Sequence, residues 1–219
     1  GDIIQGMLHD PRDGAPLAWQ QSAAIHYLTQ FVMFLAAQFP SVEVHCASGN
    51  HGRNKLRHSD RAVHQKWDSH ETVIYYAVKE AILASGITNV KFNIPKAPYV
   101  VIQVFDKKIW AGHGDSALRV GYPSQSINVK SLSHQILKWN EAKNVGGPFD
   151  LFVVGHIHTG AQVRLPEGSI LTNGCLNPAD PYALSIGAPN NACGQWLFES
   201  VEGYVLGDSR FIEVNTVDT

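Results

Sequence analysis

Hydrophobic residues recur at two different spacings along the chain, and each spacing predicts a different kind of element. Three segments place their apolar residues on one stripe of a helix, at a period of about 3.6 residues. The second of these begins at Ser69, a favourable N-cap, and is followed by Gly86, a residue typical of helix ends. The predicted helices are residues 17–39, 69–83 and 126–142.

Shorter segments rich in β-branched and aromatic residues predict strands. Residues 99–105 and 108–111 predict a hairpin around Asp106 and Lys107, and 161–214 predicts a series of short strands. The remaining predicted strands are residues 42–46, 90–94 and 149–154. Because helices and strands alternate over the first two thirds, we expect an α/β fold with two facing sheets covered by helices. A chain of 219 residues predicts a single domain over residues 1–219.

The segment from Phe149 to Gly160 joins an apolar strand to a polar turn that contains His156 and His158. In an extended backbone residues i and i+2 point to the same side, so both imidazoles are predicted to face one cavity. Gly155 allows the chain to turn sharply before them. Neutral imidazoles are ligands for Zn, Mn, Fe or Ni. Two ordinary turn histidines would give the same letters, so the motif alone leaves both interpretations open.

Charge and composition exclude several classes of protein. Hydrophobic residues make up 44% of the chain and charged residues 16%, which is enough for a core and argues against disorder. The net charge of −2 excludes a general polyanion-binding surface, although five basic residues between positions 53 and 66 are a local candidate for phosphate contacts. A solvated loop would explain that segment equally well. No run of 18 apolar residues is present, so no membrane span is predicted.

The three cysteines, Cys46, Cys175 and Cys193, are odd in number and widely spaced. This pattern is typical neither of a disulfide framework nor of a zinc knuckle. It favours a reducing compartment, and a cytoplasmic location is therefore expected.

Four segments share one order: an apolar strand or strand exit, a glycine, and then a residue able to bind metal. They are Gly1-Asp2, Gly49-Asn50-His51, Gly112-His113-Gly114 and Gly155-His156-Ile157-His158. Over about residues 1–180 these blocks resemble the calcineurin-like metallophosphoesterase superfamily, in which the blocks read D-x-H, G-D, G-N-H, H-G and G-H-x-H. The spelling is most similar to a phage and bacterial branch described as DNA-repair exonucleases. The resemblance implies a four-layer αββα sandwich.

The resemblance also implies a role for each block. The carboxylate of Asp2 would bridge two divalent metal ions, and His51 would protonate or steady the leaving oxygen. Arg53 would bind a phosphate oxygen of the substrate. Mn²⁺ is the preferred metal, with Zn²⁺, Fe²⁺, Ni²⁺ and Mg²⁺ as alternatives. The implied metal ligands are Asp2, Asn50, His113, His156 and His158. A surface acid, a turn asparagine and ordinary loop histidines are the plainer explanations of the same residues.

The first block of the superfamily, a D-x-H on the first strand, is absent from the start of this sequence, and no D-x-H occurs later in a plausible place. The fold is therefore expected to be N-terminally incomplete, and a complementary N-terminal polypeptide or a homo-oligomer is expected to complete it. The predicted function is a metal-dependent, nuclease-like phosphodiesterase, with a phosphate ester such as DNA as the substrate. Two alternatives stay open: a small-molecule phosphomonoesterase or nucleotidase, and a non-catalytic fragment that needs a partner segment for its first metal site.

Overall fold

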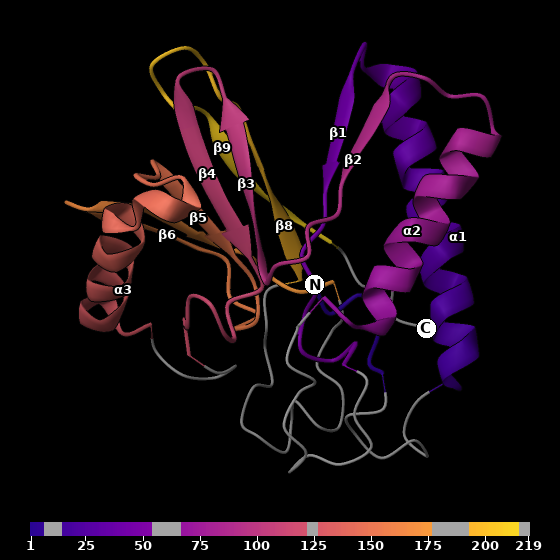
Figure 1. The fold of residues 1–219 in the computed structure, drawn as a ribbon, viewed down its shortest axis with the longest axis horizontal. Helices are drawn as coiled ribbons and strands as arrows, with labels where there is room; N and C mark the ends of the chain where they lie inside the picture. The colour runs from indigo at the N-terminus through magenta and orange to yellow at the C-terminus, as the bar shows by residue number, and fades with distance from the viewer. Residues whose placement is uncertain (7–14, 54–66, 122–126, 177–192, 215–219) are drawn as a thin grey trace. The chain divides into compact units, whose positions relative to one another are not determined.

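The computed structural model describes residues 1–6, 15–53, 67–121, 127–176 and 193–214. Its helices and mixed sheet confirm the predicted α/β class, while the four-layer arrangement stays a prediction. The chain forms two compact units, Gly1–Val100 and Val101–Thr219, and each is described by itself (Figure 1).

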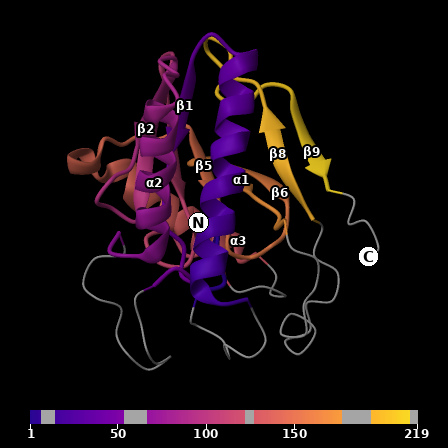
Figure 2. The ribbon, with the colours of Figure 1, turned by 90° about the vertical axis from the view of Figure 1, so that its right-hand side faces the viewer.

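The first unit combines two helices with a pair of parallel strands. Val42 of β1 lies opposite Val90 of β2, and the two helices pack against each other beside this pair (Figure 2). Ser69 caps α2 as predicted, because its hydroxyl accepts a hydrogen bond from the backbone N–H of Glu71 at 3.1 Å. The elements are α1 (Leu17–Gln38), β1 (Val42–His45), α2 (His70–Ala84) and β2 (Val90–Asn93).

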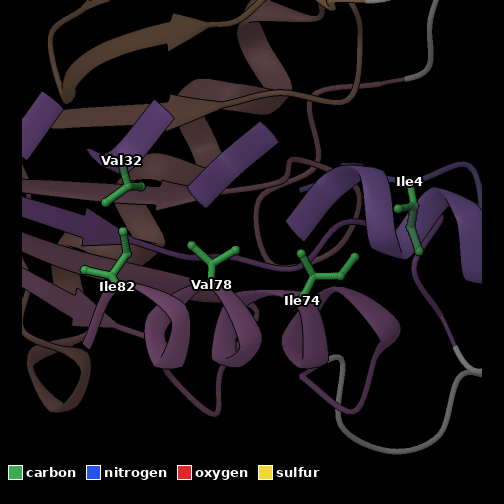
Figure 3. Packing of buried hydrophobic residues seen from close by; sticks show 5 residues of the cluster. All are labelled: Ile4, Val32, Ile74, Val78 and Ile82. Atoms are coloured by element: carbon green, nitrogen blue, oxygen red, sulfur yellow. The ribbon is translucent and has the colours of Figure 1, made fainter. Parts of the chain in front are cut away.

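The core of the first unit lies between α1, α2 and the strand pair (Figure 3). Residues four apart on α2 supply its largest part, which is the helical periodicity that the sequence predicts. Val44 and Phe92 pack against it from the strands, so burial of one helix face holds the strand pair in place. The buried members are Ile4, Val32, Ile74, Val78 and Ile82.

The second unit contains a five-stranded sheet in the order β3-β4-β5-β7-β6. Strands β4, β5 and β7 run parallel, and β6 pairs antiparallel with β7. Strands β8 and β9 form a separate antiparallel pair. The strands are β3 (Tyr99–Val104), β4 (Lys107–Gly112), β5 (Leu151–Val154), β6 (Ala161–Leu165), β7 (Gly168–Thr172), β8 (Gly194–Phe198) and β9 (Ser209–Glu213).

Side chains on the two faces of this sheet alternate with the pleat. One face carries Ile109 and Leu151, against which Trp196 of β8 packs. The other carries Trp110, which is fully buried with its ring centroid 5.4 Å from that of Trp139 on α3 (Val129–Glu141). Core packing therefore accounts for both Trp110 and Trp139.

The helix predicted over 126–142 begins later than expected, at Val129. Asn128 caps it, because its side-chain oxygen accepts a hydrogen bond from the backbone N–H of Ser131 at 3.0 Å. Residues 122–126 lie outside the described part of the chain. Within the described part, no helix combines the length and the hydropathy that crossing a membrane requires.

Candidate metal-binding loops

Two loops of the first unit carry predicted site residues: the Asp2 loop (residues 1–6) and the Asn50 loop (residues 47–53), which follows β1. The Oδ1 atom of Asp2 accepts a hydrogen bond from the backbone N–H of His51 at 2.8 Å. A Cβ added to Gly49 would lie 2.0 Å from that same Oδ1 atom. One added to Gly1 would lie 2.2 Å from the backbone nitrogen of Gly49. The glycines thus allow the two loops to meet backbone to backbone.

His51 is oriented by the Asp2 loop. Its Nδ1 lies 3.2 Å from the carbonyl oxygen of Gln5, and because a carbonyl only accepts, Nδ1 is assigned the proton. The other ring nitrogen, Nε2, lies 3.9 Å from Oδ2 of Asp2. This distance places the Nε2 edge of the ring on the side of the predicted bridging carboxylate, and the ring as a whole is partly buried.

Asn50 and Arg53 lie in the same loop. Asn50 is buried, with 6% of its surface exposed. Its backbone carbonyl oxygen accepts a hydrogen bond from Nε of Arg53. Arg53 also forms an isolated antiparallel bridge with Ser69, just before α2. Its contact with substrate stays a prediction, and its observed contacts hold the Asn50 loop closed.

Glu71 is the residue of this region that sequence reasoning missed. It is fully buried in the first turn of α2. Its Oε1 accepts from the backbone N–H of Ile3 at 2.7 Å, and its Oε2 accepts from that of Gly49 at 2.6 Å. An acidic residue in the first turn of a helix is usually a solvated partner of the helix dipole. Nothing in the local sequence distinguishes this one from that common case.

In the second unit the structure brings His113 and His156 together. Nδ1 of His156 lies 3.2 Å from Nε2 of His113, and the two rings meet edge to face with centroids 5.0 Å apart. His113 follows β4 and is only 4% exposed, whereas His156 follows β5 and is partly buried. The backbone N–H of Gly155 donates to the carbonyl of His113 at 2.9 Å, which continues the parallel ladder into the turn.

The extended backbone predicted for His156 and His158 is wrong. β5 ends at Val154, and both histidines have left-handed φ angles of 71° and 57°. The backbone N–H of Ile157 donates to the carbonyl of Gly155 at 2.9 Å, which closes a three-residue turn around His156. A turn of this kind with a positive central φ is the strained form. The tight turn, rather than strand alternation, sets the direction of these imidazoles.

Backbone strain marks three of the five predicted metal ligands. Asp2, His156 and His158 all have positive φ, at 58°, 71° and 57°. In an L-residue this conformation costs about 1–2 kcal/mol, and tight turns at functional sites are where such conformations cluster. Phe105, in the β3–β4 hairpin turn, also has positive φ, so the strain supports a site only together with the residue types.

The imidazole pair fits a metal ion chemically. At 3.2 Å the two ring nitrogens form an N–H···N hydrogen bond in which the tautomers decide the donor, and two imidazoles that bind one cation adopt a similar spacing. Two nitrogens bound to one Zn²⁺ at about 2.0–2.1 Å in tetrahedral geometry would lie about 3.3 Å apart. Within the first unit, the Asp2 loop offers a carboxylate and the Asn50 loop an amide, and both are groups that divalent metals bind.

Two neighbouring segments remain. The basic segment following Arg53 falls on residues 54–66, which lie outside the described part of the chain. The turn at Asn173, after β7, contacts β5 and β8: its backbone N–H donates to the carbonyl of Val154 at 2.7 Å, and its side-chain oxygen accepts from the backbone N–H of Trp196 at 3.1 Å.

No protein-family model matches the chain, and no curated protein matches it. Among solved structures, a hypothetical protein from Pyrococcus horikoshii OT3 is 12% identical, covers 66% of this chain and 49% of its own, and has a TM-score of 0.36. This chain therefore spans about half the length of that protein. A conserved uncharacterized protein from Streptococcus pneumoniae TIGR4, described as a predicted phosphoesterase, is 11% identical over 57% of this chain and 71% of its own, with a TM-score of 0.32.

Wild-type Vps29 from Entamoeba histolytica, crystallised as a complex with Zn²⁺, is similar over a longer span. It is 13% identical, covers 95% of both chains and has a TM-score of 0.42. At these identities and TM-scores the similarities establish neither a family nor an activity for this chain.

Proposed function

We propose that the chain is a metal-dependent phosphoesterase. The observation that carries the proposal is the pairing of His113 with His156: their ring nitrogens lie 3.2 Å apart, and the backbone of His156 is in a strained turn. The order of the four glycine-led blocks, which resembles the calcineurin-like metallophosphoesterases, supports it further. The proposed metal ligands are Asp2, Asn50, His113, His156 and His158.

The proposed ligands are carboxylate, amide and imidazole groups, which are donor types that divalent cations bind. Bound there, such cations would supply Lewis-acid stabilisation of the phosphoryl oxygens and an activated water. The chain's own contribution is orientation. The backbone N–H of His51 donates to Oδ1 of Asp2, and this hydrogen bond fixes one oxygen of the proposed bridging carboxylate. The Gln5 carbonyl accepts from Nδ1 of His51 and thereby orients the ring, and in its doubly protonated form the ring would donate the Nε2 proton to a leaving oxygen.

For the substrate we propose a phosphodiester, with single-stranded DNA as the test polymer and Mn²⁺ as the preferred metal. Arg53 would contribute its planar guanidinium to a non-bridging phosphate oxygen. A phosphomonoesterase would use the same ligands, so a paired assay separates the two. Faster release of nitrophenol from bis(p-nitrophenyl) phosphate than from p-nitrophenyl phosphate supports the diesterase, and the reverse order supports the monoesterase.

The metal centre itself is tested by substitution. We expect His113→Ala and His156→Ala each to weaken Mn²⁺ binding by at least about 10–100-fold. That is the usual effect of removing a residue that only hydrogen-bonds to a metal ligand, and loss of the ligand itself should cost no less. His51→Ala should leave Mn²⁺ affinity near that of the wild type and lower kcat by about 10²–10⁴-fold, the usual contribution of a general acid. Isothermal titration with MnCl₂ and the diester assay measure the two effects.

His134→Ala is the matched control, because His134 is exposed on α3 and should change neither quantity. A wild-type protein that binds no Mn²⁺, Zn²⁺ or Fe²⁺ would reject the proposal and favour the non-catalytic alternative. Metal binding without hydrolysis of either ester would reject the esterase and leave only a metal-binding protein.

A further inference from the structure

Glu71 connects the two loops of the first unit that carry proposed ligands. Its carboxylate uses one oxygen for the backbone N–H of Ile3 and the other for that of Gly49, at 2.7 and 2.6 Å. Ile3 directly follows Asp2, and Gly49 directly precedes Asn50. The Glu71 side chain thus holds a peptide group next to Asp2, the proposed bridging ligand, and another next to Asn50, a further proposed ligand.

The position of this carboxylate is restricted on several sides. Glu71 is fully buried, and the hydroxyl of Ser69 accepts a hydrogen bond from its backbone N–H, which anchors the first turn of α2. A Cβ added to Gly52 would lie 2.5 Å from Cγ of Glu71. Tyr75, one helical turn later, is buried and donates from its hydroxyl to the carbonyl of Ala47 at 3.1 Å. The helix, the Asn50 loop and the carboxylate therefore interlock.

A fully buried glutamate is unusual unless it is paired or hydrogen-bonded. Here both acceptor oxygens are used by main-chain donors of two loops distant in sequence, at separations of 68 and 22 residues from Glu71. A residue needed only to fill the core would be replaced at lower desolvation cost by an apolar side chain. The geometry points instead to a part in the placement of the loops.

We propose that Glu71 is a positioning residue, which sets the distance between the Asp2 loop and the Asn50 loop and thereby the geometry of metal binding. The proposal rests on the proposed function for its second half. Its first half, the coupling of the two loops, can be tested without any metal. Glu71 itself touches neither the proposed metal nor the substrate.

Glu71→Gln is the most direct test, because the amide has nearly the same shape but replaces one acceptor by a donor that faces a main-chain N–H. We expect the amides of Ile3 and Gly49 to exchange with solvent at least about 10-fold faster, measured by NMR in the metal-free protein. Mn²⁺ affinity should fall about 10–100-fold, the usual effect of an outer-shell partner.

Glu80→Gln is the matched control, since it removes the same charge from an exposed position of the same helix. It should leave both amides and the Mn²⁺ affinity unchanged. Gly52→Ala provides a second route: it keeps the carboxylate but displaces it, and it should accelerate exchange at the same two amides. Should Glu71→Gln fail to fold, Gly52→Ala decides the question alone.

Unchanged exchange at Ile3 and Gly49 in a folded Glu71→Gln protein would overturn the coupling of the loops. Faster exchange with unchanged Mn²⁺ affinity would overturn the link to metal binding. If the wild-type protein binds no metal at all, the proposed function fails, while the exchange measurement still decides whether Glu71 holds the two loops together.

Discussion

Cys46 lies at the junction between β1 and the Asn50 loop, where burial determines its chemistry. The residue is 7% exposed, and burial raises the pKa of its thiol from 9.0 to about 12. The thiol therefore stays protonated at neutral and mildly alkaline pH, and a protonated thiol is a poor nucleophile and a poor metal ligand. Cys46 therefore acts as a small apolar residue of the core.

The raised pKa of Cys46 predicts how stability depends on pH. The unfolded chain releases this proton above about pH 9, whereas the folded protein retains it until about pH 12, so stability is complete below pH 9 and falls as pH rises between these values. The loss should approach about 1.4 kcal/mol per pH unit in that window. Urea unfolding at several pH values, compared between wild type and Cys46→Ala, measures it.

The same comparison controls for a second buried group. Burial, followed by the nearby Glu71 carboxylate, raises the pKa of the Tyr75 hydroxyl well above its usual value, and this has the same sign. Tyr75 is present in both proteins, so the parts of its pKa shift that come from burial and from Glu71 cancel in the difference, whereas the smaller part that comes from Cys46 is lost together with the thiol. A Cys46→Ala protein with the wild-type slope above pH 9 would contradict the assignment to Cys46.

At the scale of elements, α2 stabilises the first unit through one face only. Ile74 is fully buried among Ile4, Val78 and Ile82, whereas its neighbour Val73 is 61% exposed. The helical period places adjacent residues about 100° apart, so these two β-branched side chains share an element but not an environment.

This contrast predicts the cost of two matched truncations on α2. Ile74→Ala should reduce the free energy of unfolding by about 2–5 kcal/mol, because it removes buried methyl groups and leaves a cavity. Val73→Ala should change it by no more than about 0.5 kcal/mol. Urea titrations followed by circular dichroism give both values. Equal losses at the two positions would contradict the burial of α2 on the Ile74 face alone.

At the scale of the whole molecule, each unit has a core cluster of its own among the described residues. One cluster in the first unit contains Ile74, one in the second contains Ile109, Leu151 and Leu171, and the two share no residue. Each unit therefore buries its own apolar surface, which is the requirement for a compact unit with its own stability.

Separate cores predict additive effects of substitution. Ile74→Ala and Leu151→Ala, one in each core, should destabilise the double variant by the sum of the single effects, to within about 0.5 kcal/mol. The measurement is a double-mutant cycle in urea. A coupling well above that value would mean that packing strain passes from one core to the other.

The sequence by itself determined the features that depend on neighbouring residues. Apolar periodicity placed α1, α2 and β5 within a few residues of their observed bounds, and Ser69 was recognisable as a cap because capping is local. Residue type and flanking glycines were enough to single out His113 and His156 as candidate ligands. Such signals are readable because propensity, capping and turn chemistry act over one or two helical turns.

Only the tertiary structure decided the rest. The left-handed turn at His156, the 3.2 Å contact of its ring with His113, and the burial of Glu71 beneath two loops all depend on segments far apart in sequence. Burial and cross-loop hydrogen bonds arise when the chain folds back on itself, and a glutamate has the same local pattern whether it faces water or two main-chain donors. The direction of each side chain therefore follows from packing, although the types of residue available to the site follow from the chain alone.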